Sequence, residues 1–313
     1  MIEVENLTKS FGPNRAVDAI SFKISSGEVV GFLGPNGAGK STTMRMITTY
    51  LAKDSGSISV AGYDVAENPY EVRQNIGYLP ESAPLYLDMD VLEYLKFSAA
   101  IRKVPGALRK ARIKEIVLAC GLGEVVSRKV GFLSKGYRQR VGLAQSMIHD
   151  PEILILDEPT TGLDPNQIVE IRDLIKSIGT EKTVILSTHI LPEVQSTCNR
   201  VLIIDKGRIV ADGKPEQLAN TISGGVSYEV AFKGGTEEIE KALTEAPFVK
   251  SFEMKSEDAE QARYSILGEG KEEIAEQIFH LAVEKKFILT ELRREIASLE
   301  SVFSSLTIGE AEE

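Results

Sequence analysis

The pattern of apolar and polar positions predicts two kinds of strand in this chain. Residues 2–8 and 19–24 alternate apolar with polar side chains, as strands with one buried face do. Residues 28–33 and 153–156 are instead nearly continuous apolar runs, which are typical of parallel strands buried on both faces. We therefore expect an α/β fold with an antiparallel part and a parallel main sheet.

A helical insert and further strands complete the prediction for the first two thirds of the chain. Strands are expected at residues 57–61 and 183–187, and residues 77–80 resemble the end of another. Apolar residues recur at helical spacing within residues 88–150, which indicates a helical insert between strands of the main sheet. A hairpin at residues 201–211 closes this part of the fold.

The last third of the chain predicts a separate small domain. Ser and Gly at residues 223–225 indicate a hinge, so we divide the chain into domains of residues 1–220 and 221–313. The order strand, helix, strand, strand, helix, strand is that of a ferredoxin-like sandwich. The predicted strands are 226–232, 248–254, 261–267 and 287–293, the predicted helices are 236–245 and 271–285, and a final helix is predicted at 298–306.

A glycine-rich loop joins the buried strand at 28–33 to a helix predicted at 41–51. Glycine lets backbone N–H groups turn inward around an anion, and the helix start adds its positive dipole end. Lys40 supplies a cation for the outer phosphates of a nucleotide, and the Ser41 hydroxyl is placed to bind Mg²⁺. The predicted nucleotide-binding residues of the loop are Gly34, Pro35, Asn36, Gly37, Ala38, Gly39, Lys40, Ser41 and Thr42.

Charged residues stand at the carboxyl ends of two predicted parallel strands, where ligands collect in open α/β sheets. Asp157 and Glu158 follow the strand at 153–156. We expect Asp157 to hold Mg²⁺ through its water shell, and Glu158 to polarise the water that attacks the terminal phosphate. His189 follows the strand at 183–187. A single histidine is more often structural, but this position favours a sensor of the terminal phosphate.

Two other groups of residues have open interpretations. Ser134 is suited to N-cap the helix that follows, and with Gly136 beside it the helix start offers free N–H groups to an anion. Taken alone these residues favour a simple helix cap, but the strand that ends in the carboxylates at 157–158 removes that preference and leaves both interpretations open. Phe11 lies in the loop predicted between the first two strands, where it either stacks on an adenine ring or packs as a satellite core residue.

The charge distribution argues against a basic binding face. The 313-residue chain has a net charge of −10; residues 222–313 hold 10 Lys and Arg against 20 Asp and Glu, and residues 1–221 hold 26 of each kind. Nonspecific binding to nucleic acid or anionic lipid needs a basic face, so both are disfavoured. No apolar run reaches the roughly 18 residues of a spanning helix and no signal peptide is evident, so we expect a soluble protein. The two widely separated cysteines, Cys120 and Cys198, favour a reduced cytoplasmic setting.

Together these motifs resemble the ATP-binding subunit of an ABC transporter, over residues 1 to about 220. The resemblance implies a P-loop NTPase ATP-binding cassette, with a RecA-like core, an antiparallel β subdomain and a helical subdomain at about 88–150. The matching segments are the Walker A loop at 34–42, the signature Leu-Ser-Lys-Gly-Tyr at 133–137, Walker B at 153–158, the D-loop at 162–165 and the switch histidine His189.

The resemblance also implies how ATP and Mg²⁺ are bound. In this family two domains pack head to tail, with ATP between the Walker A loop of one and the signature of the other, so the implied partner is a second copy of this chain. Ser134 and Gly136 then face phosphates that the second copy holds. Phe11 becomes the aromatic that stacks on adenine. The remaining implied roles are nucleotide contact for Asp164, catalysis for Glu158, His189 and Lys40, and Mg²⁺ binding for Ser41, Asp157 and Glu81.

Two motifs depart from the family pattern. The signature carries Lys135 and Tyr137 where the family usually has glycine and glutamine, while Ser134 and Gly136 are kept. Glu81 stands where the family's Q-loop usually has glutamine. An ionised carboxylate there repels a terminal phosphate but can still bind Mg²⁺ or order water. We predict a working ATPase with a modified link between this loop and its membrane partner.

Residues 76–86 resemble a subgroup that serves ABC-2-type exporters, including gliding-motility-associated subunits. The chain is therefore predicted to be the ATP-hydrolysing subunit of such an exporter, held at the inner face of the cell membrane by a separate, multispanning permease. The domain at 221–313 is interpreted as regulatory or dimer-bracing, against the alternative of inert packing.

A soluble ABC ATPase that acts on ribosomes or DNA is the alternative function. Ribosome-directed members carry two ATPase domains in one chain, and DNA-directed members insert a long coiled coil between Walker A and Walker B. Neither feature is present in this sequence, and no heptad repeat is sustained. Kinases and GTPases share the phosphate loop but have no use for residues 133–137.

Overall fold

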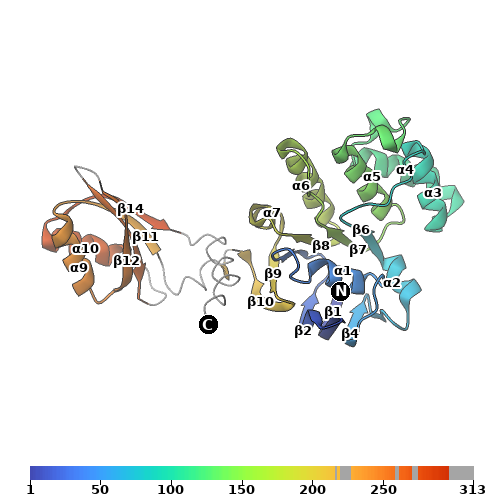
Figure 1. Ribbon diagram of the computed structural model, residues 1–313. Helices are drawn as coiled ribbons and strands as arrows, with labels where there is room; N and C mark the ends of the chain where they lie inside the picture. The colour runs from blue at the N-terminus through green and yellow to red at the C-terminus, as the bar shows by residue number, and fades with distance from the viewer. Residues whose placement is uncertain (216, 219–226, 258–260, 270–273, 296–313) are drawn as a thin grey trace. The chain divides into compact units, whose positions relative to one another are not determined.

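The computed structural model describes residues 1–215, 217–218, 227–257, 261–269 and 274–295 (Figure 1). The chain divides into two compact units, Met1–Gly213 and Lys214–Glu313. The hinge predicted at 223–225 lies outside the described residues, as does the end of the predicted first domain at residue 220. Both stay predictions.

The main sheet of the first unit has the strand order β10-β9-β3-β8-β7-β6, and all neighbours are parallel except β10 and β9. Its register sets Leu33 beside Thr188 and Asp157 beside Ser187, so the ends of three strands meet at one edge. The strands are β3 (Val29–Leu33), β6 (Ile76–Leu79), β7 (Ile153–Asp157), β8 (Thr183–Thr188), β9 (Arg200–Asp205) and β10 (Arg208–Gly213).

A second, antiparallel sheet has the order β2-β1-β4-β5, formed by β1 (Ile2–Phe11), β2 (Asn14–Ile24), β4 (Ser55–Val60) and β5 (Tyr63–Asp64). The first two strands are longer than predicted. Phe11 ends β1, so the prediction that it lies in a loop is wrong. The pairing of β1 with β2 contains register shifts, and Asn6 and Ala19 have positive φ values. These irregularities interrupt the alternation of apolar and polar side chains, so the alternation predicted strands that are too short.

Helices cover the main sheet and form the predicted insert between β6 and β7 (Figure 1). The first of them, which follows the glycine-rich loop, is shorter than predicted. It ends at Ile47, and Thr49 soon after takes a φ of 62°, which a continuing α-helix does not allow. The helices are α1 (Lys40–Ile47), α2 (Pro69–Asn75), α3 (Val91–Ile101), α4 (Gly106–Ala119), α5 (Lys135–Met147), α6 (Pro165–Gly179) and α7 (Leu191–Thr197).

One hydrophobic core fixes the glycine-rich loop relative to both sheets. Met44 and Ile47 of α1 are fully buried and share this core with Val4 of β1 and Phe32 of β3. The rings of Phe32 and Phe22 lie 5.7 Å apart between centroids. Because α1 is held on both sides, the loop that precedes it has little freedom to move away from the sheet edge.

The second unit has the predicted order of elements. Its antiparallel sheet has the strand order β12-β13-β11-β14, which is that of a ferredoxin-like sandwich. Phe232, Tyr264, Ile239 and Ile278 pack its core, with both helices contributing to the same side of the sheet. The helix predicted at 298–306 lies outside the described residues. The elements are β11 (Ser227–Lys233), α9 (Thr236–Glu245), β12 (Val249–Glu257), β13 (Ala262–Gly268), α10 (Ala275–Lys285) and β14 (Ile288–Glu295).

Candidate active site

Glycine is required at two positions of the loop between β3 and α1. A β-carbon at Gly34 would collide with the carbonyl oxygen of Ile204, and one at Gly39 would collide with that of Ala16. Gly39 also has a φ of 109°, in the region that side chains other than glycine rarely adopt. The loop is therefore held against its neighbours by backbone contact, and α1 begins directly after it at Lys40.

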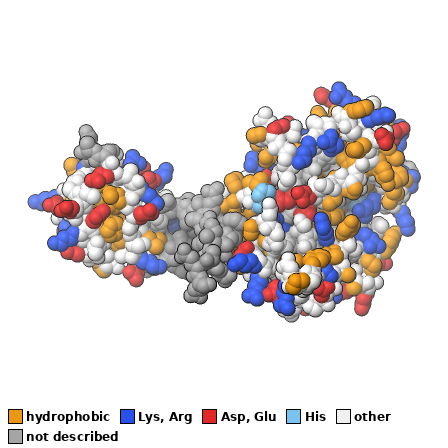
Figure 2. Space-filling model, in the orientation of Figure 1, with side chains coloured by type: hydrophobic (Ala, Val, Ile, Leu, Met, Phe, Trp, Pro, Cys, Tyr) orange, Lys and Arg blue, Asp and Glu red, His pale blue; other side chains and the backbone are white. Residues whose placement is uncertain are grey.

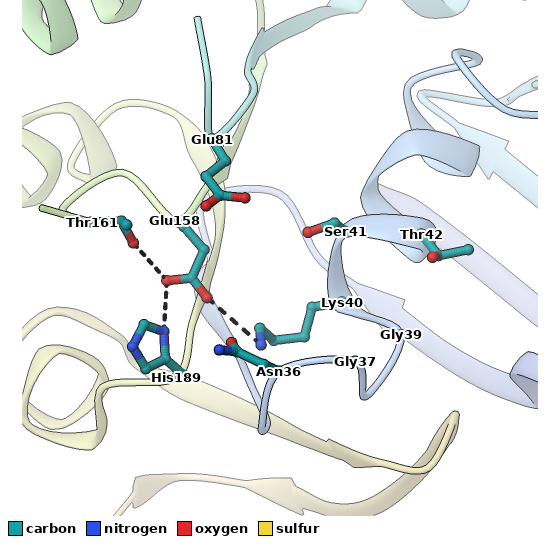
Figure 3. Close-up of a pocket in the computed structure, with 10 residues that line it drawn as sticks. All are labelled: Asn36, Gly37, Gly39, Lys40, Ser41, Thr42, Glu81, Glu158, Thr161 and His189. Atoms are coloured by element: carbon teal, nitrogen blue, oxygen red, sulfur yellow. Dashed lines mark hydrogen bonds and ion pairs between the residues drawn. The ribbon is translucent and has the colours of Figure 1, made fainter.

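Lys40 crosses the mouth of this loop (Figure 3). Its ammonium nitrogen donates to the carbonyl oxygens of Gly34 at 2.7 Å and Pro35 at 3.1 Å, and lies 3.6 Å from Oε1 of Glu158. Burial lowers the pKa of Lys40, and the carboxylates of Glu158, Asp157 and Glu81 oppose that shift. A buried ammonium among carbonyl oxygens and carboxylates is placed to receive an anion that displaces them.

Asp157 provides donor atoms that suit Mg²⁺. Its Oδ1 accepts hydrogen bonds from the hydroxyls of Ser41 at 3.0 Å and Ser187 at 2.6 Å. Its Oδ2 is buried and has no hydrogen-bond partner within the described part of the chain. A buried carboxylate oxygen left unpaired beside a serine hydroxyl fits a hard cation that prefers oxygen ligands. Ser41 and Asp157 would hold the ion.

Glu158 is fixed in position by two side chains and by an unusual backbone. Its Oε2 accepts from the Thr161 hydroxyl at 3.1 Å and lies 2.9 Å from Nδ1 of His189, which carries the proton in that contact because a carboxylate only accepts (Figure 3). Its φ is 49°, a strained value for a residue with a side chain. Its backbone N–H donates to the Ser187 hydroxyl at 3.0 Å. These contacts hold Oε1 towards Lys40.

Glu81 enters the same space from the loop after β6. Figure 3 shows its carboxylate directed between Glu158 and Ser41. The residue is exposed, and no ion pair of Glu81 occurs within the described ranges. Its charge therefore acts on whatever ligand occupies this space.

The structure brings many, but not all, of the predicted site residues into one pocket of about 340 Å³. Eight predicted site residues do not line it: Phe11, Gly34, Pro35, Ala38, Ser134, Gly136, Asp157 and Asp164. The roles of all the predicted site residues stay predictions. The lining residues are Asn36, Gly37, Gly39, Lys40, Ser41, Thr42, Glu81, Glu158, Thr161 and His189.

The residues outside the pocket have local roles in this chain. The Phe11 ring is 51% exposed, with the Lys9 ammonium 5.7 Å from its centroid. Ser134 caps α5 by accepting from the backbone N–H of Tyr137 at 3.3 Å. Asp164 caps α6 in the same way, accepting from the N–H of Gln167 at 2.9 Å. Ser134 is exposed and accessible to a ligand carried by another molecule, whereas Gly136 is buried beside the side chain of Gln167.

Two residues that hold the site were missed in the sequence. Thr161 stands three positions after Glu158, and the turn through Pro159 returns its hydroxyl to that carboxylate. Ser187 lies one residue before the end of β8, the strand that His189 follows, and the signal for its role is its register opposite Asp157. A hydroxyl near the end of one strand thus orients a carboxylate at the end of the neighbouring strand.

Comparisons with known proteins give the family of this chain. The profile of the ABC transporter family matches residues 17–161. The linearmycin resistance ATP-binding protein LnrL of Bacillus subtilis (strain 168) is 35% identical over 235 residues, which are 75% of this chain and 76% of that protein. The chain belongs to the ABC transporter ATP-binding proteins. The predicted P-loop NTPase fold and ATPase class are thereby confirmed.

Other ABC proteins match more of the chain or resemble its fold. The ABC transporter ATP-binding protein YxlF of the same strain, itself uncharacterised, is 31% identical over 97% of this chain and 98% of its own length. A solved ATP-binding subunit of an ABC transporter superposes with a TM-score of 0.64 and 29% identity over 70% of this chain and 91% of that one. The cassette MJ0796, solved as a dimer bound to ADP and Pi, has a TM-score of 0.63 at 24% identity, which shows the shared fold.

Proposed function

We propose that this chain is the ATP-hydrolysing subunit of an ABC-2-type exporter and works as a head-to-tail dimer. The observation that carries the proposal is that one pocket joins the phosphate loop, Lys40 and Glu158, while the helix start at Ser134 lies outside it. A second copy supplies that helix start. The names of relatives support export, since they include linearmycin and daunorubicin resistance ATP-binding proteins and a Nod factor export ATP-binding protein.

The proposed chemistry follows from the positions of the side chains. The loop N–H groups and Lys40 bind the phosphates of ATP. Mg²⁺, held by Ser41 and Asp157, neutralises phosphate charge when bound. Glu158 takes a proton from the attacking water, and Thr161 and His189 keep its carboxylate oriented. Ser134 and Gly136 of the second copy close the site, which couples hydrolysis to opening and closing of the dimer.

A permease is the proposed partner of a groove beside this site. None of the helices in the described ranges is long and apolar enough to cross a membrane. The groove, of about 450 Å³, lies between the loop after Glu81 and α3. Tyr86 and Ile101 in it are 55% and 62% exposed, and the loop continues directly from Glu81. If a permease segment binds in this groove at the inner face of the membrane, movements of the Glu81 loop caused by the nucleotide would be transmitted to it.

Nucleic acid is not proposed as a partner. On the face shown in Figure 2, basic and acidic side chains are interspersed and no broad basic surface appears. Salt-dependent binding to phosphate backbones needs such a surface.

The second unit is proposed to regulate or brace the dimer. It has its own apolar core, and its described residues bury no charged side chain. Truncation after residue 220 tests this role. If dimerisation and transport are unchanged, the second unit neither regulates nor braces the dimer.

Cross-linking in the protein's own membranes tests the function. We expect a multispanning protein to be retained with the chain, and retention to be lost in Tyr86→Glu and Ile101→Glu. Tyr50→Glu is the matched control, because Tyr50 is 78% exposed and lies outside the groove. Retention of ribosomal or DNA-bound proteins in place of a membrane protein would contradict the proposal.

A further inference from the structure

Two charges in this chain replace uncharged residues that are usual in its family. Glu81 stands in place of glutamine, and Lys135 stands in place of glycine. One change adds a negative charge to the nucleotide pocket, and the other adds a positive charge beside the helix start at Ser134. The two changes are therefore opposite in sign and lie on the two surfaces that the proposed dimer brings together.

The pocket of a single chain is electrostatically unfavourable for a terminal phosphate. Glu81 and Glu158 line the pocket, and Asp157 lies behind Ser41, from whose hydroxyl it accepts a hydrogen bond, while Lys40 is the ammonium group in the lining. Glu81 points into the space between Glu158 and Ser41 (Figure 3); its charge acts on Lys40, but it forms no ion pair within 4.0 Å in the described part of its own chain. An added cation near Glu81 would offset its repulsion of the phosphate.

Lys135 is a cation without an ion-pair partner in the described part of its own chain. It is the first residue of α5, directly after the cap Ser134, and it is exposed. No carboxylate lies within ion-pair distance of it among the residues that the structure describes. Its ammonium group occupies the position where a β-carbon at Gly162 would stand, so it extends over the turn that leads to Asp164. The charge thus sits at the exposed surface that carries the signature and the D-loop.

We propose that Lys135 of one copy forms an ion pair with Glu81 of the second copy when ATP closes the dimer. This inference rests on the proposed head-to-tail dimer. Ser134 approaches the terminal phosphate there, so the neighbouring lysine comes to the pocket wall that bears Glu81. Because both charges are on every chain, a twofold dimer forms the pair twice. The pair favours a second copy of this chain over a subunit that has glutamine and glycine at these positions.

A double-mutant cycle on ATP-dependent dimerisation tests the pair. The full-length Glu158→Gln protein is the parent, and its dimer dissociation constant is measured by sedimentation with ATP for Glu81→Gln, Lys135→Ala and both together. We expect Lys135→Ala to weaken the parent dimer about tenfold, which is about 1.4 kcal/mol, and to have less than about a threefold effect in the Glu81→Gln background. Lys135→Arg should retain dimerisation, and Lys110→Ala, which removes an exposed lysine of α4, should have no effect.

Equal effects of Lys135→Ala in both backgrounds would overturn the pair, because a lysine that contacts only phosphate does not sense residue 81. Measuring with Mg²⁺ and again with EDTA separates the remaining role of Glu81. We expect the coupling between Glu81→Gln and Lys135→Ala in both conditions. If Glu81→Gln changes the dimer dissociation constant only with Mg²⁺ and shows no coupling to Lys135→Ala, Glu81 acts on the metal ion and the ion pair is overturned. If the Glu158→Gln parent binds ATP but stays monomeric, both the proposed dimer and the ion pair are contradicted.

Discussion

The two units of this chain are both sheets covered by helices, but they use buried polar groups differently. The first unit buries Lys40, Asp157, Glu158 and Ser187 at one edge of a parallel sheet. The described part of the second unit buries apolar side chains and tyrosines, and its ion pairs, such as Arg263 with Glu291 at 3.2 Å, stay at the surface. Buried charge costs free energy, so its concentration at one edge indicates function there.

The difference follows from topology. Parallel strands end on the same side, so β3, β7 and β8 bring three loops to one place. Neighbouring antiparallel strands run in opposite directions, so their loops alternate between the two ends of the sheet, and the second unit gains no comparable convergence. The first unit is therefore expected to respond to changes in chemistry, and the second to changes in packing.

The largest expected effect is at Glu158, the proposed general base of ATP hydrolysis in the first unit. Glu158→Gln should lower the rate of ATP hydrolysis by about 10²–10⁴-fold, because the amide cannot accept the proton of the attacking water. Phosphate release from the purified chain measures this. Glu152→Gln, which changes an exposed glutamate just before the start of the same strand, is the control and should leave the rate unchanged. If both variants lost the same fraction of the hydrolysis rate, Glu158 would not be the general base.

A packing change in the second unit comes next. Phe232→Ala should reduce the free energy of unfolding of that unit by about 3–5 kcal/mol, because Phe232 is fully buried among Tyr264 and Phe287. Hydrogen exchange should rise within residues 227–295 and stay unchanged at residues 34–42. Phe279→Ala, at a ring 51% exposed, is the control with a small effect. Faster exchange at the phosphate loop would mean that the two units do not separate as described.

The third effect is a pH dependence within the first unit. Burial lowers the pKa of His149 to about 4, from 6.5 for an unperturbed side chain. Between pH 6.5 and pH 4 the unfolded chain therefore binds more protons at His149 than the folded chain does. The free energy of unfolding has its full value above pH 6.5 and falls as the pH drops towards 4. We expect a loss of about 2 kcal/mol between pH 7 and pH 5. Denaturant unfolding at both pH values measures it, and His149→Gln should lose less; an equal loss would place the pH dependence elsewhere.

The smallest effect concerns the orientation of Glu158. Thr161→Val removes the hydroxyl that donates to Oε2 and keeps the shape of the side chain. We expect the hydrolysis rate to fall about fivefold, which corresponds to about 1 kcal/mol. Thr161→Ser keeps the hydroxyl and should restore the rate. If both variants behaved like the unchanged protein, the contact would be structural only.

The sequence predicted the order of elements and the residues at strand ends, because both depend on local pattern. Buried strands read as apolar runs, and Asp157 and Glu158 stand directly after one. The extent of β1 and the place of Phe11 were wrong, because register shifts between two strands leave no local trace. Thr161 and Ser187 were missed because their importance lies in contacts with Glu158 and Asp157 across the fold. The hydrogen bond from the Lys40 ammonium group to the Gly34 carbonyl oxygen was likewise not predictable, because it depends on the three-dimensional path of the loop.

The central claim is that the pocket of one chain is completed by the helix start of another. Sedimentation of the Glu158→Gln protein, with and without ATP, tests this most directly. The account predicts a monomer without ATP and a dimer with it, and predicts that Ser134→Arg, which blocks the helix start, abolishes the dimer while each chain still binds ATP. A Glu158→Gln chain that binds ATP and remains monomeric, or a dimer indifferent to Ser134→Arg, would contradict it.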